Sequence, residues 1–166
     1  MPSATRKPKH MTPPELAAHT AKWAVIMAKV RIRQAIADNP WPHWHVLSFT
    51  GPAGSEAKGV VDLIAVRKYH GKPSPGLNRG DSLQIILIQV KGGSAAMPTA
   101  DDARRLRIVA RRHGACGILL ATWRKGTAAQ FFSLNGKTKT RRDWHPVDDL
   151  GGVFGRRKEA IQTGLA

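Results

Sequence analysis

The chain has 166 residues, of which 27 are Lys or Arg and 11 are Asp or Glu, so its formal net charge is +16. This length favours a single domain with a hydrophobic core, and the 42% hydrophobic content excludes a chain that is disordered throughout. The single cysteine, Cys116, excludes an internal disulfide framework and a structural zinc site built on several thiolates.

The charge and the hydropathy pattern bear on partners and location. No apolar run approaches the roughly 20 residues of a membrane-spanning helix, and no signal-peptide pattern opens the chain. We therefore expect a cytoplasmic protein with no membrane contact. So large an excess of positive charge favours a polyanionic partner, and nucleic acid is the commonest of these. Charge that serves only solubility is the alternative.

Residues 1–12 are polar, basic and interrupted by two prolines, so we expect a disordered basic arm. Thr12 then provides a cap hydroxyl, two prolines suit the first helical turn, and Glu15 can complete a capping box. This pattern predicts a helix over 13–37, which ends at an Asp-Asn-Pro sequence.

Two apolar strips run along this predicted helix. One face, at helical spacing, comprises Leu16, Trp23, Ile26, Met27, Val30, Gln34 and Ala37. A second strip on the opposite side comprises Val25, Ile32 and Ile36. A helix that is apolar on two sides is buried on two sides, either within the fold or at a dimer contact, and the sequence leaves both alternatives open.

Beyond this helix, segments rich in β-branched residues alternate with one segment of helical period. The predicted elements are strands 44–49, 59–67 and 83–91, a helix 98–113, and strands 116–123 and 129–134. The Gly- and Pro-rich segment 69–82 indicates an exposed hairpin loop. The order α-β-β-β-α-β-β predicts an α/β fold with a mixed sheet flanked by helices. We expect one domain over 13–135 and a basic, partly flexible C-terminal extension over 136–166.

One acid stands within an apolar run, and two polar residues end the next one. An ionised Asp62 among valines and leucine is costly unless it meets a metal, a cation or water. Gln89 and Lys91 lie two apart, so their side chains point to one side while Val90 points into the core. If the two segments form a hairpin, the three polar residues converge at a strand end. A plain salt bridge between Asp62 and Lys91 is the alternative.

The series GVVDLIAVR, a hairpin, IILIQVK, a basic helix and two further strands resembles the PD-(D/E)XK nuclease superfamily. Within it, the layout is most similar to the small Holliday junction resolvases and related structure-specific nucleases. The resemblance spans roughly residues 14–134. It implies a restriction-endonuclease-like fold, a DNA substrate, and Mg²⁺ as cofactor, for which Mn²⁺ can substitute.

The resemblance also implies roles for individual residues. Asp62 matches the metal-binding aspartate of the family motif, and Lys91 matches its catalytic lysine. Gln89 stands where the motif has a second acid, so a neutral amide oxygen would assist there. Glu56 is one candidate for the missing charge. The catalytic set is thus Asp62, Gln89 and Lys91, and the metal-binding set is Asp62, Gln89, Val90 and Glu15.

Two regions are predicted to contact DNA. Ser48 and Lys58 border the loop before the acidic strand, where the resemblance implies contacts with the cleaved strand. The helix 98–113 has one apolar face, comprising Ala103, Leu106, Val109, Ala110 and His113. Its other face carries Arg104, Arg105, Arg107, Arg111 and Arg112. Because these arginines repel one another unless an anion lies between them, we favour contact with the phosphate backbone over a solvated surface.

These observations together predict a Mg²⁺-dependent endonuclease that hydrolyses phosphodiester bonds in branched or structured DNA. The resemblance also implies a homodimer, because two symmetric cuts require two sites. The alternatives are a non-catalytic DNA-binding module on the same fold and an RNA-associated basic protein.

Overall fold

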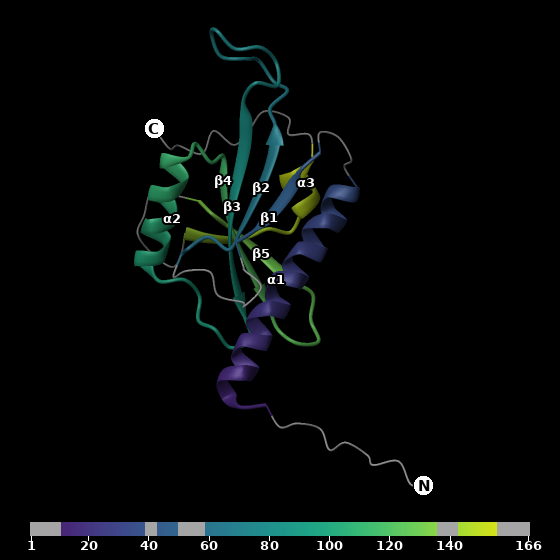
Figure 1. The fold of residues 1–166 in the computed structure, drawn as a ribbon, viewed down its shortest axis with the longest axis vertical. Helices are drawn as coiled ribbons and strands as arrows, with labels where there is room; N and C mark the ends of the chain where they lie inside the picture. The colour runs from purple at the N-terminus through teal and green to yellow at the C-terminus, as the bar shows by residue number, and fades with distance from the viewer. Residues whose placement is uncertain (1–10, 39–42, 50–58, 136–142, 156–166) are drawn as a thin grey trace.

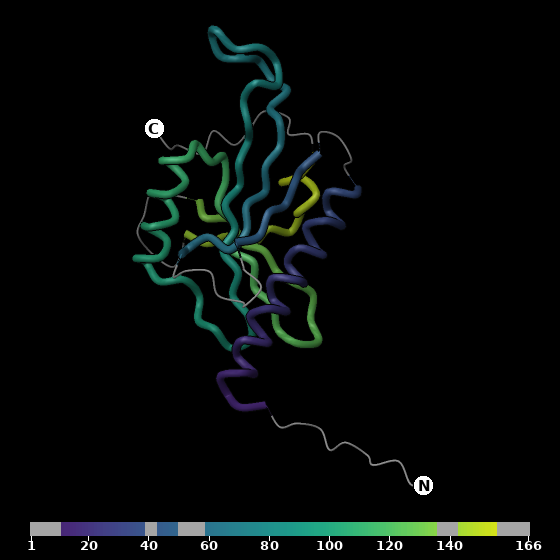
Figure 2. Tube along the Cα trace, viewed as in Figure 1, coloured from purple at the N-terminus to yellow at the C-terminus, as the bar shows by residue number. Residues whose placement is uncertain are grey.

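Six strands form one mixed sheet with helices on both faces (Figures 1 and 2). The computed structural model describes residues 11–38, 43–49, 59–135 and 143–155. In chain order the elements are α1 (Pro13–Ala37), β1 (His45–Ser48), β2 (Leu63–Lys68), β3 (Leu83–Gly92), α2 (Ala100–Arg112), β4 (Gly117–Trp123), β5 (Gln130–Leu134), β6 (Trp144–Pro146) and α3 (Leu150–Phe154).

The strands lie side by side in chain order, from β1 to β6. Neighbouring strands are antiparallel except β3 and β4, which are parallel because α2 carries the chain back between them. The segment between β2 and β3 projects beyond the sheet as predicted (Figure 1). The α/β class is confirmed. The structure adds β6 and α3 to the predicted elements, since segments of three and five residues are too short to show a period.

The helix α1 begins as the sequence predicts. The Glu15 N–H donates to the Thr12 hydroxyl, and the Thr12 N–H donates to the Glu15 carboxylate at 2.8 Å. This capping box satisfies two N–H groups that have no partner within the helix. Thr12 is therefore part of the folded structure, while residues 1–10 of the predicted arm lie outside the described residues.

The structure shows which face of α1 meets the sheet. Its buried residues are Ala24, Ala28, Ile32 and Ala35. The strip that contains Ile32 thus packs on the sheet. The longer strip is not buried within the chain, because its large side chains are between 37% and 55% exposed, namely Leu16, Trp23, Ile26 and Val30. Of the two alternatives that the sequence left open, a dimer contact is the one that would bury it.

A close approach between α1 and β3 explains this choice of face. A Cβ added at Gly92 would lie 2.9 Å from the Ala24 Cβ and 3.0 Å from the Thr20 carbonyl oxygen. Only small side chains fit between backbones at this distance. The alanine-rich face of the helix therefore lies against the sheet, and the face with the larger side chains points outward.

Two hydrophobic clusters cover the two faces of the sheet. On one side, α1 and α3 pack on alternate strand residues such as Leu63, Ile88 and Phe131. On the other side, α2 packs on Leu87 and Leu120. Because side chains alternate along a strand, these clusters identify which of the remaining strand residues point to the α1 side and which to the α2 side.

The helix α2 is amphipathic as predicted, with Ala103, Leu106 and Ala110 buried. The expectation that His113 lies on the apolar face was wrong, because the helix ends one residue earlier and His113 is an exposed C-cap residue. No helix within the described residues is long and apolar enough to cross a membrane.

Residues 143–155, predicted to be part of a C-terminal extension, pack into the fold. β6 pairs with β5, and Phe154 is fully buried against Trp44 with ring centroids 5.5 Å apart. The Trp44 indole N–H donates to the Phe154 carbonyl oxygen at 2.7 Å. The Arg67 guanidinium lies 4.4 Å from the centre of the Trp44 ring and donates to the Gly155 carbonyl oxygen. These contacts hold the end of the described chain against the first two strands.

Candidate functional site

Asp62, Gln89 and Lys91 come together at the end of the sheet away from the projecting hairpin. Leu63 and Val90 pack in the cluster on the α1 side, so the residues next to them along each strand face the α2 side. The three polar residues therefore share one face. A shared site requires this arrangement, since a carboxylate and an amine on opposite faces could not hold one ligand.

Asp62 lies one residue before β2, so the predicted position within the strand is corrected. Its main chain still extends the sheet: the N–H donates to the Ile88 carbonyl oxygen and the carbonyl oxygen accepts from the Phe49 N–H, both at 3.0 Å. The Asp62 carboxylate accepts the Val90 N–H at 2.6 Å, where a strand would supply a main-chain oxygen. These three hydrogen bonds fix the carboxylate beside Gln89 and Lys91.

Gln89 carries a buried acceptor without a partner. The residue is 5% exposed, and its Oε1 has no hydrogen-bond partner within the described residues. An unsatisfied buried group costs about 1–3 kcal/mol, so its presence in a native fold calls for an explanation. A cation or a ligand that approaches this oxygen would supply the missing partner.

Burial raises the pKa of Asp62 above its ordinary value. The hydrogen bond from Val90 and the positive charge of Lys91 act in the opposite direction but do not outweigh the loss of hydration. In the described part of the chain, Asp62 and Lys91 form no direct ion pair. Charges held at an energetic cost are typical of sites that bind or react, so this geometry does not favour a plain salt bridge.

Glu15 is placed apart from this cluster. It lies in the first turn of α1, the helix that covers the opposite face of the sheet. Its carboxylate accepts hydrogen bonds from the N–H and the hydroxyl of Thr12, and these bonds hold the pKa of Glu15 below its ordinary value. The structure thus assigns Glu15 to the helix cap rather than to a group with Asp62.

The remaining predicted residues around the loop before β2 have different positions. Ser48 pairs with Leu63 and therefore faces the α1 side, opposite Gln89 and Lys91. Val90 points its side chain into the α1-side cluster as predicted, so only its main chain lies at the site. Lys58 and Glu56 lie outside the described residues.

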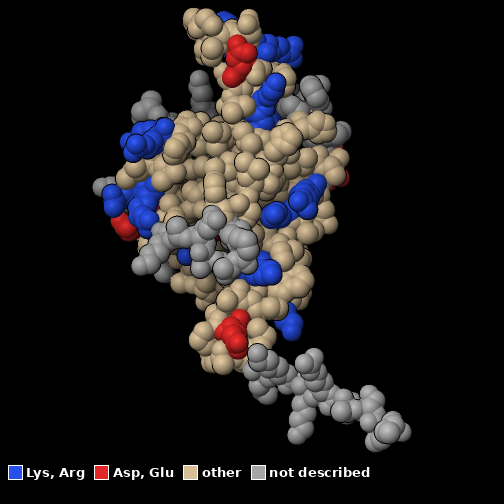
Figure 3. Space-filling model, in the orientation of Figure 1, with Lys and Arg blue, Asp and Glu red and all other residues tan. Residues whose placement is uncertain are grey.

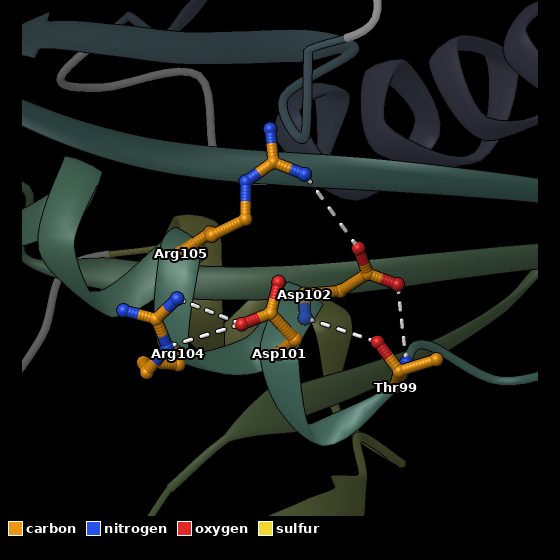
Figure 4. Close-up of polar contacts among 5 residues, drawn as sticks. All are labelled: Thr99, Asp101, Asp102, Arg104 and Arg105. Carbon is orange, nitrogen blue, oxygen red and sulfur yellow. Dashed lines mark hydrogen bonds and ion pairs between the residues drawn. The ribbon is translucent and has the colours of Figure 1, made fainter.

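The arginines of α2 do not form one unpaired basic face. Arg104 donates to Asp101 at 2.7 and 3.1 Å, and Arg105 lies 4.0 Å from Asp102 (Figure 4). Exposed pairs of this kind contribute at most about 1 kcal/mol, but they lower the net charge that a phosphate would meet. The other two exposed arginines, Arg111 and Arg112, lie in the last turn, where positive charge suits the helix dipole.

Arg107 has a partner from a distant part of the chain. It donates to the Asp143 carboxylate at 2.5 Å, and the two side chains are 16% and 3% exposed. This pair holds α2 to the segment before β6 and neutralises the Arg107 charge within the fold. Arg107 is therefore not retained as one of the predicted DNA contacts. The 36 residues between the partners explain why no local pattern indicated the pair.

Two polar residues on the α2 side were absent from the predicted site. Thr122 pairs with Lys91 across β3 and β4, and Gln130 pairs with Thr122 across β4 and β5. Ala121 and Phe131 pack in the α1-side cluster, so Thr122 and Gln130 face the same side as Lys91. Both residues could have been recognised from the sequence, because each is a polar residue near the end of an apolar strand and alternates with residues that face the core.

Positive charge is spread over the surface of the molecule. Figure 3 shows Lys and Arg over the edge formed by α2, along α1 and around the projecting hairpin, with fewer acidic residues on this face. Such a distribution attracts polyanions over this whole face and does not by itself select one binding position. The position of the polar cluster at the strand ends is therefore the more specific observation.

The oxygen atoms at this site fit a hard cation that shares its ligands with a substrate. Mg²⁺ usually keeps several waters and is held by one or two carboxylates together with substrate phosphates. Asp62 offers one carboxylate, and Gln89 offers a neutral oxygen that has no partner among the residues that the structure describes. No group of three or more His, Cys, Asp or Glu side chains in the described ranges could hold a metal alone. The donor set fits Mg²⁺ only with water and phosphate as further ligands.

Comparison with known proteins found no family model, no curated protein and no solved structure that matches this chain.

Asp62→Asn is expected to stabilise the protein at neutral pH. Because the folded-state pKa of Asp62 lies above its unfolded value, the ionised form is disfavoured on folding, and stability falls as pH rises between the two values. We expect a Tm a few degrees above wild type at pH 7.5, with the difference shrinking as pH is lowered toward 4.5. Asp148→Asn, at an exposed carboxylate, is the control. A lower Tm for Asp62→Asn at pH 7.5 would contradict the assignment.

Arg107→Ala is expected to destabilise the protein by about 3 kcal/mol, because it removes a partner from a carboxylate that is almost fully buried. Arg104→Ala is the matched control, since its pair with Asp101 is exposed and should contribute less than about 1 kcal/mol. Urea unfolding of both variants measures the difference. Equal losses in the two variants would show that the pair with Asp143 is not structural.

Proposed function

We propose that this protein is a Mg²⁺-dependent endodeoxyribonuclease of the PD-(D/E)XK type, which hydrolyses phosphodiester bonds in branched or structured DNA as small Holliday junction resolvases do. The observation that carries the proposal is the meeting of Asp62, Gln89 and Lys91 at one end of the sheet, with the Asp62 carboxylate 2.6 Å from the Val90 nitrogen. The net charge of +16 supports a nucleic-acid substrate. A DNA substrate is consistent with a cytoplasmic location.

The element order supports the proposed restriction-endonuclease-like fold. A helix, three antiparallel strands, a crossover helix and a fourth strand parallel to the third follow one another as the resemblance implies. In this arrangement the start of β2 and the end of β3 meet at the same end of the sheet. The acid just before β2 and the lysine near the end of β3 would therefore face a common substrate.

Phosphodiester hydrolysis needs a positioned water and stabilisation of the negative charge that develops on the phosphate. In this proposal, Lys91 would orient the attacking water or hold a phosphate oxygen. Asp62 and Gln89 would hold Mg²⁺ through their side-chain oxygens, and Val90 fixes the Asp62 carboxylate through its N–H. When bound, Mg²⁺ supplies Lewis-acid stabilisation of the phosphate.

The outward face of α1 supports a homodimer as part of the proposal. The exposed residues Leu16, Trp23, Ile26 and Val30 recur at spacings of seven, three and four, which places them on one stripe of the helix. Contact between two such stripes would remove large apolar side chains from water. A two-fold dimer would present two sites for two cuts in a symmetric junction.

One observation favours a second candidate function, a DNA-binding module without catalysis. Within the described residues, Asp62 is the one carboxylate at the site, and the neutral Gln89 stands at the position of the second acid. A neutral oxygen binds Mg²⁺ more weakly than a carboxylate does. A chain that kept the basic surface and lost metal binding would retain affinity for DNA but would not cut it.

Cleavage assays on a Holliday junction, a flap and a linear duplex, with Mg²⁺ or Mn²⁺, test the enzyme. Wild type is expected to cut the branched substrates, whereas Asp62→Asn and Lys91→Met should each lower the rate by about 100-fold or more with little change in DNA affinity. Gln89→Glu adds a carboxylate and should lower the Mg²⁺ concentration that gives half the maximal rate. Lys72→Met, on the projecting hairpin, is the control for loss of one lysine.

Three outcomes would overturn this assignment. If wild type binds DNA but never cuts it with either metal, the protein is a binding module. If Lys72→Met loses as much activity as Lys91→Met, the lysine acts only through overall charge. If wild type binds RNA as tightly as DNA or more tightly, with strong salt dependence, an RNA-associated function replaces the nuclease.

A further inference from the structure

A row of polar side chains leads from the proposed site across the sheet. Lys91, Thr122 and Gln130 occupy neighbouring register positions on β3, β4 and β5. All three face the α2 side, because the residues beside them, Val90, Ala121 and Phe131, pack in the α1-side cluster. Since neighbouring strands lie about 4.8 Å apart, the row spans about 10 Å from Lys91 to Gln130.

This row lies where the apolar packing against α2 ends. Two residues further into the sheet along β4 and β5, the same face carries Leu120 and Phe132, which belong to the core beneath α2. Thr122 is partly exposed and Gln130 is exposed. Within the described residues, no hydrogen bond involves the Thr122 hydroxyl or the Gln130 side-chain amide. Both groups are therefore available to a ligand.

The turn between β4 and β5 adds two cations at the same end of the sheet. Arg124 and Lys125 are both exposed. Thr127 holds the turn closed, because its N–H and hydroxyl both donate to the Arg124 carbonyl oxygen, at 3.1 and 2.9 Å. The Trp123 indole N–H donates to the Thr127 carbonyl oxygen at 3.0 Å. Because the Trp123 side chain packs on the α1 side, this bond draws the turn toward that side. The two cations thus stand on an ordered turn at the strand ends, two and three residues after Thr122.

Within the described residues, neither Arg124 nor Lys125 forms an ion pair with an acid. Asp and Glu are absent between Asp102 and Asp143, a segment that contains all of β4, β5 and their turn. The cations of the turn differ in this respect from Arg104, Arg105 and Arg107 on α2, each of which has an acidic partner. An anion that approaches the site along β4 and β5 therefore meets charges that the protein has not neutralised.

The chemistry of the row suits phosphates rather than bases. A hydroxyl, an amide and cations are groups that bind phosphate oxygens. Base stacking would need an aromatic side chain on this surface. The nearby Trp123 packs against the α1-side cluster and does not serve that purpose. The row thus offers hydrogen bonds and charge along a line, without a feature that would read sequence.

We propose that Lys91, Thr122 and Gln130, together with Arg124 and Lys125, form a backbone-binding track for the cleaved DNA strand. The track rests on the proposed nuclease function, because it begins at the proposed catalytic lysine. Its length of about 10 Å corresponds to roughly three base steps of about 3.4 Å measured along a duplex axis. The track holds phosphates on one side of the scissile bond and so orients the strand across Asp62.

Binding measurements in an Asp62→Asn background, without divalent metal, test the track separately from catalysis. In a plot of the logarithm of DNA affinity against the logarithm of salt concentration, the slope of the Arg124→Gln/Lys125→Gln double variant should be less steep by about 1.8. Each phosphate contact contributes about 0.9 to this slope. The matched control is Arg31→Gln/Arg33→Gln, which removes two exposed cations from α1 on the opposite face. It should leave the slope nearly unchanged.

Methylphosphonate substitution, one phosphate at a time, locates the contacts. Neutral linkages within about three nucleotides on one side of the cut should weaken binding by the Asp62→Asn protein, and this effect should be smaller in variants that also carry Thr122→Val or Gln130→Leu. Equal slopes for the turn variant and the α1 control, or sensitive phosphates that respond identically in all variants, would overturn the track. Cleavage by the otherwise wild-type protein is scored independently, so the track can fail while the nuclease stands, and the reverse.

Discussion

The hydrogen bond between the Val90 N–H and the Asp62 carboxylate defines this end of the molecule. It replaces a rung of the β2–β3 ladder at the point where the strands separate, and it keeps a charged group beside Gln89 in a region with little water. Burial raises the pKa of Asp62 in spite of this bond and of Lys91. The Asp62 carboxylate therefore lowers the stability of the fold. Such a cost is expected where residues are selected for binding or reaction rather than for packing.

The topology of the sheet extends this local feature into a surface. Since β3 and β4 are parallel, their ends lie at the same edge, and Thr122 comes to lie beside Lys91. The antiparallel β5 then returns from a short turn and adds Gln130 next to Thr122. Polar residues that are far apart in the sequence thus form one line. The crossover helix α2 covers the apolar residues further into the sheet and leaves this line at its border.

The sequence predicted the long periodic elements and the residues that meet at the site, because alternation in strands and period in helices follow directly from backbone geometry. It did not predict which face of α1 would be buried. Both strips of the helix are apolar, whereas the close approach at Gly92 selects alanines for the face on the sheet, and that distance depends on tertiary packing. The Arg107–Asp143 pair and the packing of Phe154 on Trp44 were missed for a related reason, since contacts between distant segments leave no local pattern.

The charge balance at the site links the proposed metal and the proposed track. Asp62 and Lys91 carry opposite unit charges and Gln89 is neutral, so these three side chains together offer a divalent cation no net negative charge. A phosphate at the same place would supply both charge and oxygen ligands for Mg²⁺. Binding of metal and DNA is then mutually favourable, each raising the affinity for the other by the same factor. In the proposed site, the phosphate contacts along β4 and β5 would assist metal binding as well as substrate binding, and a glutamine at position 89 would support catalysis only while those contacts persist.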